Sequence, residues 1–278
     1  MKGNLNNMMQ RFLRAFAALA VAGALFGQSA STKQPKPKSQ KEAEAYNAMV
    51  TAPDADADAR IAAAENLITK FADTEFKALA LYIATEGYQR KNDFEKMVIY
   101  GERALEADPK MYAVMLILAP GYASKTKEFD FDKDEKLSKA EKFANEGIAL
   151  VKTAAKPDNS AISVEQWSAI RNDFMSRGHE ALGMTAMARK KYDAAVAAYK
   201  EALALQPTPD PTTMLRLASA LNQLGKWDEA MPLLDKIKES PEAVPIVKQE
   251  AARERVKALM AQKKAAAPPP PPPPAPKP

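Results

Sequence analysis

Residues 191–207, KYDAAVAAYKEALALQP, decide the fold of this chain of 278 residues. Ala195, Tyr199 and Ala202 recur at the spacing of one face of an α-helix. Pro207 ends the pattern, because proline cannot donate the hydrogen bond that a helix interior requires. The stretch therefore predicts an amphipathic helix that ends at a defined residue.

The same pattern recurs along the chain. Tyr192 and Trp227 open matching helices 35 residues apart, and Gly225 supplies a turn that needs a positive φ. Gly183 falls where two helices must approach closely, and an earlier copy runs from Leu81 to Pro109. A repeat of this length predicts stacked helix pairs.

These repeats resemble tetratricopeptide repeats, which place small residues at the closest helix contacts, aromatic residues between them and a proline at the end. The match is good over residues 177–207 and 211–237 and fair over 79–109. The resemblance implies an all-α fold, a TPR-like right-handed α–α superhelix of about five helix pairs and a C-terminal capping helix. It also implies a concave face, lined by the first helices, that binds protein or peptide partners.

Two weaker copies, over residues 42–74 and 111–151, complete the five pairs. The second contains Ala119-Pro120-Gly121, where proline should kink or shorten the helix. It also carries an insert at residues 124–134, SKTKEFDFDKD. The register of this third repeat therefore stays open.

Two further helices are expected outside the regular pattern. Residues 163–189 predict one unusually long helix with Trp167, Ile170 and Phe174 facing inward. Ser240-Pro241 predicts the start of a final helix. In that helix Ala252, Val256 and Leu259 form an apolar stripe that would cover the last hydrophobic face.

The composition argues against an enzyme. The chain has no cysteine and one histidine, which excludes disulfides, thiol catalysis and a His-based metal cluster within one chain. That histidine, His179, is predicted to be a core or half-buried residue. Phosphate-binding glycine loops, serine elbows and paired-carboxylate motifs do not stand out. We therefore predict no catalytic residue and no cofactor, and the interspersed charges predict no nucleic-acid partner.

The two ends predict an exported chain with four segments. Residues 1–30 resemble a secretory signal, with an apolar stretch at 15–26 after three basic residues, and an uncleaved anchor is the alternative. Residues 31–41 predict a flexible linker, and 42–262 the solenoid. The proline-rich tail, 263–278, is either a stiff spacer or a ligand for an aromatic groove. The mature chain is expected to be periplasmic or secreted, without a membrane span.

The expected function is a non-enzymatic scaffold for protein–protein interaction in a bacterial cell envelope. Carried over by register from the family, the partner-binding groove mixes aromatic, methionine and charged side chains, which suits a helix or an extended peptide. Its predicted residues are Tyr82, Glu86, Gln89, Arg90, Leu116, Glu180, Met184, Met187, Leu215, Arg216, Ser219 and Asn222.

The alternative function is a calcium- or ligand-binding envelope module that uses two acidic runs. Asp54, Asp56, Asp58 and Glu65 have the spacing of an EF-hand loop, as do Asp130, Asp132, Asp134 and Glu141. The glycine that such a loop needs at its sixth position is absent from both runs. Both runs also precede a predicted helix, where acids would cap backbone amides instead, so no metal site is predicted.

Overall fold

The computed structural model describes residues 35–156 and 162–265, and these residues are all-helical. The predicted signal at residues 1–30 and the proline run at 268–274 lie outside the described residues. Within the described part, no helix is both long and apolar enough to cross a membrane.

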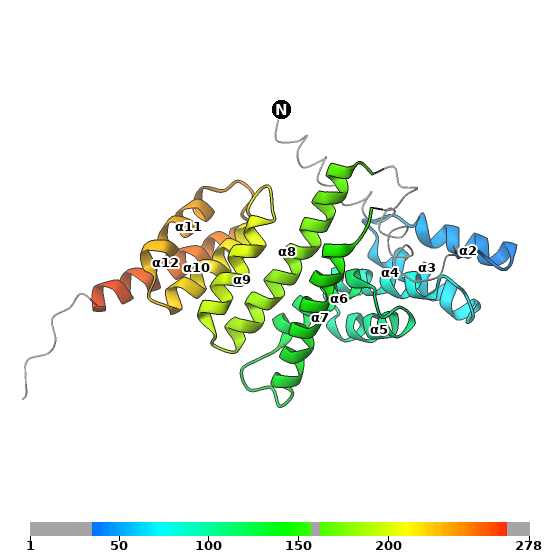
Figure 1. Ribbon diagram of the computed structural model, residues 1–278, viewed down its shortest axis with the longest axis horizontal. Helices are drawn as coiled ribbons and strands as arrows, with labels where there is room; N and C mark the ends of the chain where they lie inside the picture. Colours follow the sequence, from blue (N-terminus) through cyan, green and yellow to red (C-terminus); the bar gives the residue numbers. More distant parts are fainter. Residues whose placement is uncertain (1–34, 157–161, 266–278) are drawn as a thin grey trace, which may run out of the picture.

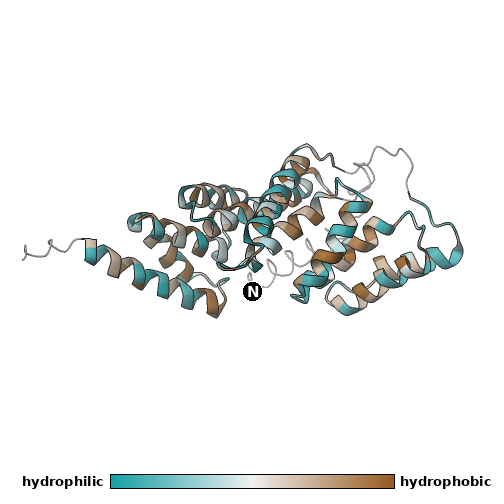
Figure 2. Cartoon of the chain, turned by 90° about the horizontal axis from the view of Figure 1, so that it is seen from below, coloured by the Kyte–Doolittle hydropathy of each residue, from teal (hydrophilic) through white to brown (hydrophobic). Residues whose placement is uncertain are grey.

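Eleven helices in the described residues form five consecutive pairs and a last single helix, stacked into an elongated array (Figure 1). Each helix packs mainly on its neighbours in the chain, as a solenoid requires. Most helices carry both hydrophilic and hydrophobic residues (Figure 2). Their bounds are α2 (Gln40–Val50), α3 (Ala57–Lys70), α4 (Lys77–Arg90), α5 (Phe94–Ala107), α6 (Tyr112–Lys125), α7 (Lys133–Thr153), α8 (Val164–Ala188), α9 (Tyr192–Ala204), α10 (Pro211–Gln223), α11 (Trp227–Glu239) and α12 (Pro245–Ala265).

Side-chain caps fix the start of five of these helices. The cap residue accepts a hydrogen bond from a backbone N–H of the first turn, which would otherwise have no partner. The caps are Ser39, Asp56, Asp93, Ser163 and Asp210. Because Ser39 caps α2, the first helix begins at the end of the segment predicted as a linker.

The turn inside three of the helix pairs uses a left-handed residue. Asn92, Lys190 and Gly225 have φ values of 57°, 59° and 70°, and each directly precedes the second helix or its cap. Gly225 confirms the turn predicted from the sequence. At Asn92 and Lys190 the same geometry is held by a residue that adopts it less easily than glycine.

Small residues set the closest contacts between helices. A Cβ atom placed at Gly183 of α8 would overlap the ring of Tyr199 in α9, which confirms the predicted close approach. Leu116 of α6 lies over two glycines at once. A Cβ at Gly147 would be 2.7 Å from its Cγ, and a Cβ at Gly178 would be 3.0 Å from its Cδ2. These contacts lock α6, α7 and α8 together.

The buried apolar side chains form two main cores. The N-terminal core extends from Ala45 to Met175, and the C-terminal core from Ala195 to Ala251. The long helix α8 confirms its prediction and enters the N-terminal core through Trp167, Ile170 and Phe174. Further along the same helix, Met184 packs against both cores.

The structure corrects the prediction at Pro120. Helix α6 continues through the proline to Lys125 and has 14 residues, the same as α4 and α5. Proline removes one backbone donor, but the buried apolar side chains along α6 hold the helix in place. The third pair therefore keeps the length of its first helix, and the insert forms the α6–α7 loop.

The final helix also differs from its prediction. It begins at Pro245, because residues 241–243 form a bend after Ser240 and not a helical turn. Its buried residues are Val247, Ala251 and Ala258. Val256 and Leu259, predicted to face inward, are 50% and 41% exposed. Small alanines let α12 approach α10 and α11 closely, so the larger side chains lie on the outer face.

Tyr112 gives the fold a dependence on alkaline pH. It packs edge-on against Phe174 at 5.3 Å, and burial raises the pKa of its hydroxyl to about 12. The unfolded chain would ionise this tyrosine near its ordinary pKa of about 10, so the stabilisation is complete below that pH. It is lost as the pH rises from about 10 to about 12, where the deficit reaches about 3 kcal/mol.

We therefore expect the Tyr112→Phe variant to lose less stability than the wild-type chain over this pH range. Urea unfolding at several pH values measures the difference, which should be small at pH 7. Parallel pH profiles for the two proteins would show that the Tyr112 hydroxyl does not carry the effect.

Candidate functional site

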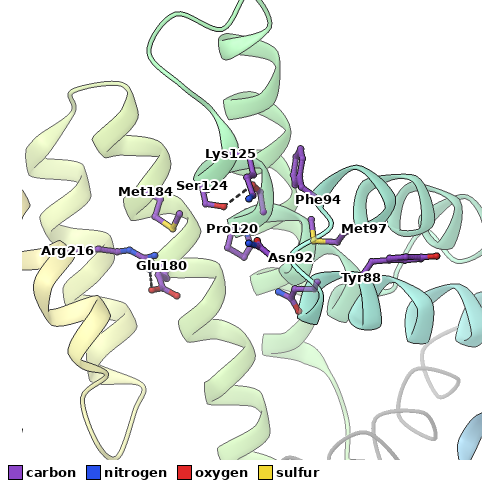
Figure 3. A pocket seen from close by; sticks show the side chains of 12 residues that line it. Tyr88, Asn92, Phe94, Met97, Pro120, Ser124, Lys125, Glu180, Met184 and Arg216 are labelled. Atoms are coloured by element: carbon purple, nitrogen blue, oxygen red, sulfur yellow. Dashed lines mark hydrogen bonds and ion pairs between the residues drawn. The ribbon is translucent and has the colours of Figure 1, made fainter. Parts of the chain in front are cut away.

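A hollow of about 190 Å³ lies between the second and third helix pairs on one side and α8 and α10 on the other. Figure 3 shows its side chains converging from α4, α5, α6, α8 and α10. The lining residues are Tyr88, Gln89, Asn92, Phe94, Met97, Pro120, Gly121, Ser124, Lys125, Glu180, Met184 and Arg216. The hollow thus joins segments that are far apart in the sequence.

The apolar wall of the hollow is built around the irregular Pro120-Gly121 pair. A Cβ at Gly121 would overlap the terminal methyl of Met97, so glycine lets the Met97 side chain cross α6 there. Phe94 stacks edge-on against Tyr122 at 5.7 Å, which fixes its ring beside that wall. Across the hollow, Met184 supplies a second flexible thioether. Methionines adapt to ligands of irregular shape.

The polar side of the hollow carries an ion pair and a separate cation. Arg216 of α10 donates to the Glu180 carboxylate of α8, and the Thr213 hydroxyl donates to the same carboxylate at 3.0 Å. Lys125 lies at the rim and makes no ion pair within residues 35–156 and 162–265. The hollow therefore offers apolar surface beside a positive charge that no described carboxylate neutralises.

The structure brings four of the twelve predicted groove residues to the hollow: Gln89, Glu180, Met184 and Arg216. Two others, Glu86 and Arg90, do not line the hollow and instead bind other residues of the chain. Glu86 accepts from Arg60 at 3.0 Å and from Arg90 at 3.2 Å. Arg90 also donates to the backbone carbonyl of Asp54.

Four predicted residues lie further along, against the C-terminal core. Met187 and Leu215 pack on that core, and Ser219 is half-buried. Asn222 donates to the carboxylate of Glu254 in α12 at 3.1 Å, so the last helix occupies that end of the predicted groove.

Tyr82 and Leu116 are corrections to the predicted groove. Their side chains are 5% and 1% exposed and belong to the N-terminal core. The repeat register gives the face of a helix but not the depth of a side chain, and Leu116, for example, lies against Gly147 of α7 and Gly178 of α8. Neither residue is available to a partner.

A family model described as "Tetratricopeptide repeat" matches residues 186–263, which run from the end of α8 through most of α12. The chain is also similar in structure to a thermophilic tetratricopeptide repeat protein of Thermus thermophilus. The TM-score is 0.52 with 16% sequence identity, over 78% of this chain and 96% of that chain. The chain therefore has the fold of a tetratricopeptide repeat solenoid, and residues 186–263 match the repeat family itself. The structural similarity shows only that the two folds are alike. No curated protein matches the chain.

In this repeat solenoid the first acidic run stabilises helices and loops. Asp56 caps α3, Asp54 accepts from Arg60, and Asp58 pairs with Lys91. Glu65 accepts hydrogen bonds from the hydroxyls of Tyr88 and Tyr100. Each of the four acids therefore has its own structural partner.

The second acidic run is used in the same way. Asp130 and Asp132 pair with Lys136, at 3.2 Å and 2.9 Å. Glu141 pairs with Arg189, the C-cap residue of α8, and Asp134 lies in the first turn of α7. Within the described part of the chain, no three acidic or histidine side chains are grouped so that they could hold a metal ion.

His179 is half-buried, as predicted, on α8. Burial lowers the pKa of its imidazole, so the neutral form is favoured in the folded protein. It is absent from the residues that line the hollow.

Sequence reasoning missed Asn92, Phe94, Met97, Ser124 and Lys125 as residues of the hollow. One signal could have found the site. A proline and a glycine next to each other within a first helix depart from the repeat pattern, and such departures mark places where side chains are re-aimed.

Proposed function

We propose that this repeat protein is a non-enzymatic scaffold that binds a protein or peptide partner at the face containing the hollow. The observation that carries the proposal is the hollow itself, since it combines two methionines, a phenylalanine and the Lys125 cation. Binding sites combine apolar walls with placed polar groups, and this hollow has both. Tetratricopeptide repeats generally act through such protein contacts.

The proposed partner presents an apolar side chain next to a carboxylate. The apolar group would enter between Met97 and Met184, and the carboxylate would meet Lys125 at the rim. The Glu180–Arg216 pair is internally neutralised and so favours neither sign strongly. The proposed location is the periplasm or another compartment of a bacterial envelope, and it rests on the apolar stretch at residues 15–26 alone.

Two charge-altering variants test the binding face. Met184→Glu places a carboxylate in the hollow, and Lys125→Glu reverses the charge at its rim. We expect each to reduce capture of a specific partner at least about tenfold. Lys110→Glu is the matched control, because Lys110 is exposed and lies just before the first residue of α6, at the end of the helix opposite Lys125.

Residues 31–278 serve as bait, with envelope and cytoplasmic extracts used in parallel. Thermal melts check that each variant is folded. A partner that binds all baits equally would refute the assignment of the hollow, and one found only in the cytoplasmic extract would refute the proposed location.

A further inference from the structure

The loop between α6 and α7 presents two aromatic rings to solvent. The loop, residues 126–132, projects at the lower edge of Figure 1, and we call it the finger loop. Phe129 and Phe131 are 93% and 112% exposed, the highest values among the exposed large hydrophobic residues described. Single apolar side chains on a surface are common, but two fully exposed phenyl rings two residues apart are typical of a binding surface.

The backbone of the finger loop is held in place. The Lys127 amide donates to the Asp130 carboxylate at 3.0 Å, and the Lys133 amide donates to the Asp130 carbonyl at 3.2 Å. Glu128 pairs with Lys133 at 2.9 Å and with Lys190 of the α8–α9 turn at 3.0 Å. Hydrogen bonds from these two lysines lower the pKa of Glu128 to about 2, so it remains ionised. The rings are thus presented by a preorganised loop, which limits the entropy lost on binding.

The hollow has the properties that such rings require. Its wall of Phe94, Met97, Pro120 and Met184 is apolar, and its volume of about 190 Å³ exceeds the roughly 150 Å³ of a cavity that holds benzene. The carboxylates of Glu128 and Asp132 in the finger loop already pair with lysines of their own chain, so the fit to the hollow depends on apolar contact and not on charge. The size and the apolar wall of the hollow therefore match a phenyl ring of the finger loop.

The finger loop and the hollow are also neighbours. Lys125 lines the hollow and Thr126 begins the loop, yet both rings of the loop remain in solvent and do not fill the hollow of their own chain. A two-fold axis near the end of α6 would let each copy insert its loop into the other, which gives a closed, self-complementary contact.

We propose that the finger loop is a self-association element, in which Phe129 and Phe131 of one copy dock at the hollow of a second copy and receive the same contact in return. One ring enters the cavity, and the other covers the apolar rim. Four phenylalanines bury about 600–800 Å² of their own surface. With the smaller accessible lining of the two hollows, the interface reaches roughly 1,000 Å², the size of a weak contact between copies. The inference shares the hollow with the proposed function but does not rest on it.

Sedimentation of the full chain as a function of concentration tests the proposal. We expect a dimer at about 100 μM, and we expect Phe129→Ser combined with Phe131→Ser to raise its dissociation constant at least about 100-fold. Met184→Glu and Lys125→Glu should weaken it from the other side. Lys125 is exposed, so this variant folds even where Met184→Glu does not.

Mixing the variants identifies which surfaces meet. The finger-loop double variant and Met184→Glu are each monomeric, but their mixture restores one of the two contacts and forms a heterodimer weaker than the wild-type dimer. Val256→Ser combined with Met260→Ser is the matched control, because it removes exposed apolar side chains from α12.

Three outcomes would overturn the proposal. The first is a wild-type chain that stays monomeric at about 100 μM, a concentration at which contacts of this size associate. The second is a dimer that tolerates the finger-loop changes. The third is a dimer that is lost only in the α12 control. A monomeric wild type that still binds its partner at the hollow would leave the proposed function standing alone.

Discussion

Replacing Leu116 with alanine is expected to lower the free energy of unfolding by about 3–5 kcal/mol. Leu116 is fully buried where α6 meets α7 and α8, and its branches lie over Gly147 and Gly178. Those glycines have no side chain that could fill the space left by the truncation. The cavity would therefore persist, and the loss should fall in the upper part of the range for buried leucines.

Urea unfolding measures this loss, with Leu259→Ala as the control. Leu259 undergoes the same chemical change on the partly exposed outer face of α12, and its replacement should cost less than about 1 kcal/mol. If Leu116→Ala instead left stability intact and weakened partner binding, Leu116 would return to the groove where the repeat register had placed it.

Replacing Arg60 with leucine is expected to cost about 3 kcal/mol. The Arg60 side chain is almost fully buried between α3 and α4, where it donates to Asp54 and to Glu86. Leucine keeps part of the apolar volume but leaves both carboxylates without this cation. Arg90 still contacts Glu86, which limits the loss to the lower part of the range for broken buried pairs.

A second substitution separates charge from packing. Adding Glu86→Leu to Arg60→Leu removes one of the unpaired carboxylates and should recover part of the stability, because an apolar replacement of both partners is often tolerated. Arg253→Leu, which breaks an exposed pair with Glu250, should cost less than about 1 kcal/mol. Urea unfolding measures the free energy of unfolding of each variant. Equal losses for Arg60→Leu and Arg253→Leu would show that burial does not strengthen the ion pairs of Arg60.

The helix pairs could be predicted because their evidence is local. The apolar spacing around Tyr199, the glycine at the Gly225 turn and the repeat period each act within one or two helices. The final helix shows where this reasoning fails. It has two apolar faces, and the prediction chose the one with larger side chains, Val256 and Leu259. Close packing instead selected the face with Ala251 and Ala258.

The hollow could be predicted only in part, since it depends on contacts between distant repeats. Its residues come from helices separated by up to three pairs, and a register gives the face of each helix but not the depth of each side chain. Leu116 and Met184 both lie on first helices, yet the first is buried under α7 and α8 while the second reaches the hollow. The finger loop has no counterpart in the repeat pattern, so the repeat pattern gave no expectation for it.

The division of the interior between two cores has a consequence for how the chain unfolds on heating. Solenoids unfold by units, and contacts between neighbouring units set the free energy of each step. Separation of the C-terminal core from the rest would leave the N-terminal core and the first part of α8 intact. The hollow spans that boundary, with Phe94 and Pro120 on one side and Arg216 on the other. The proposed binding would therefore disappear at the first step, while most of the helical structure remains.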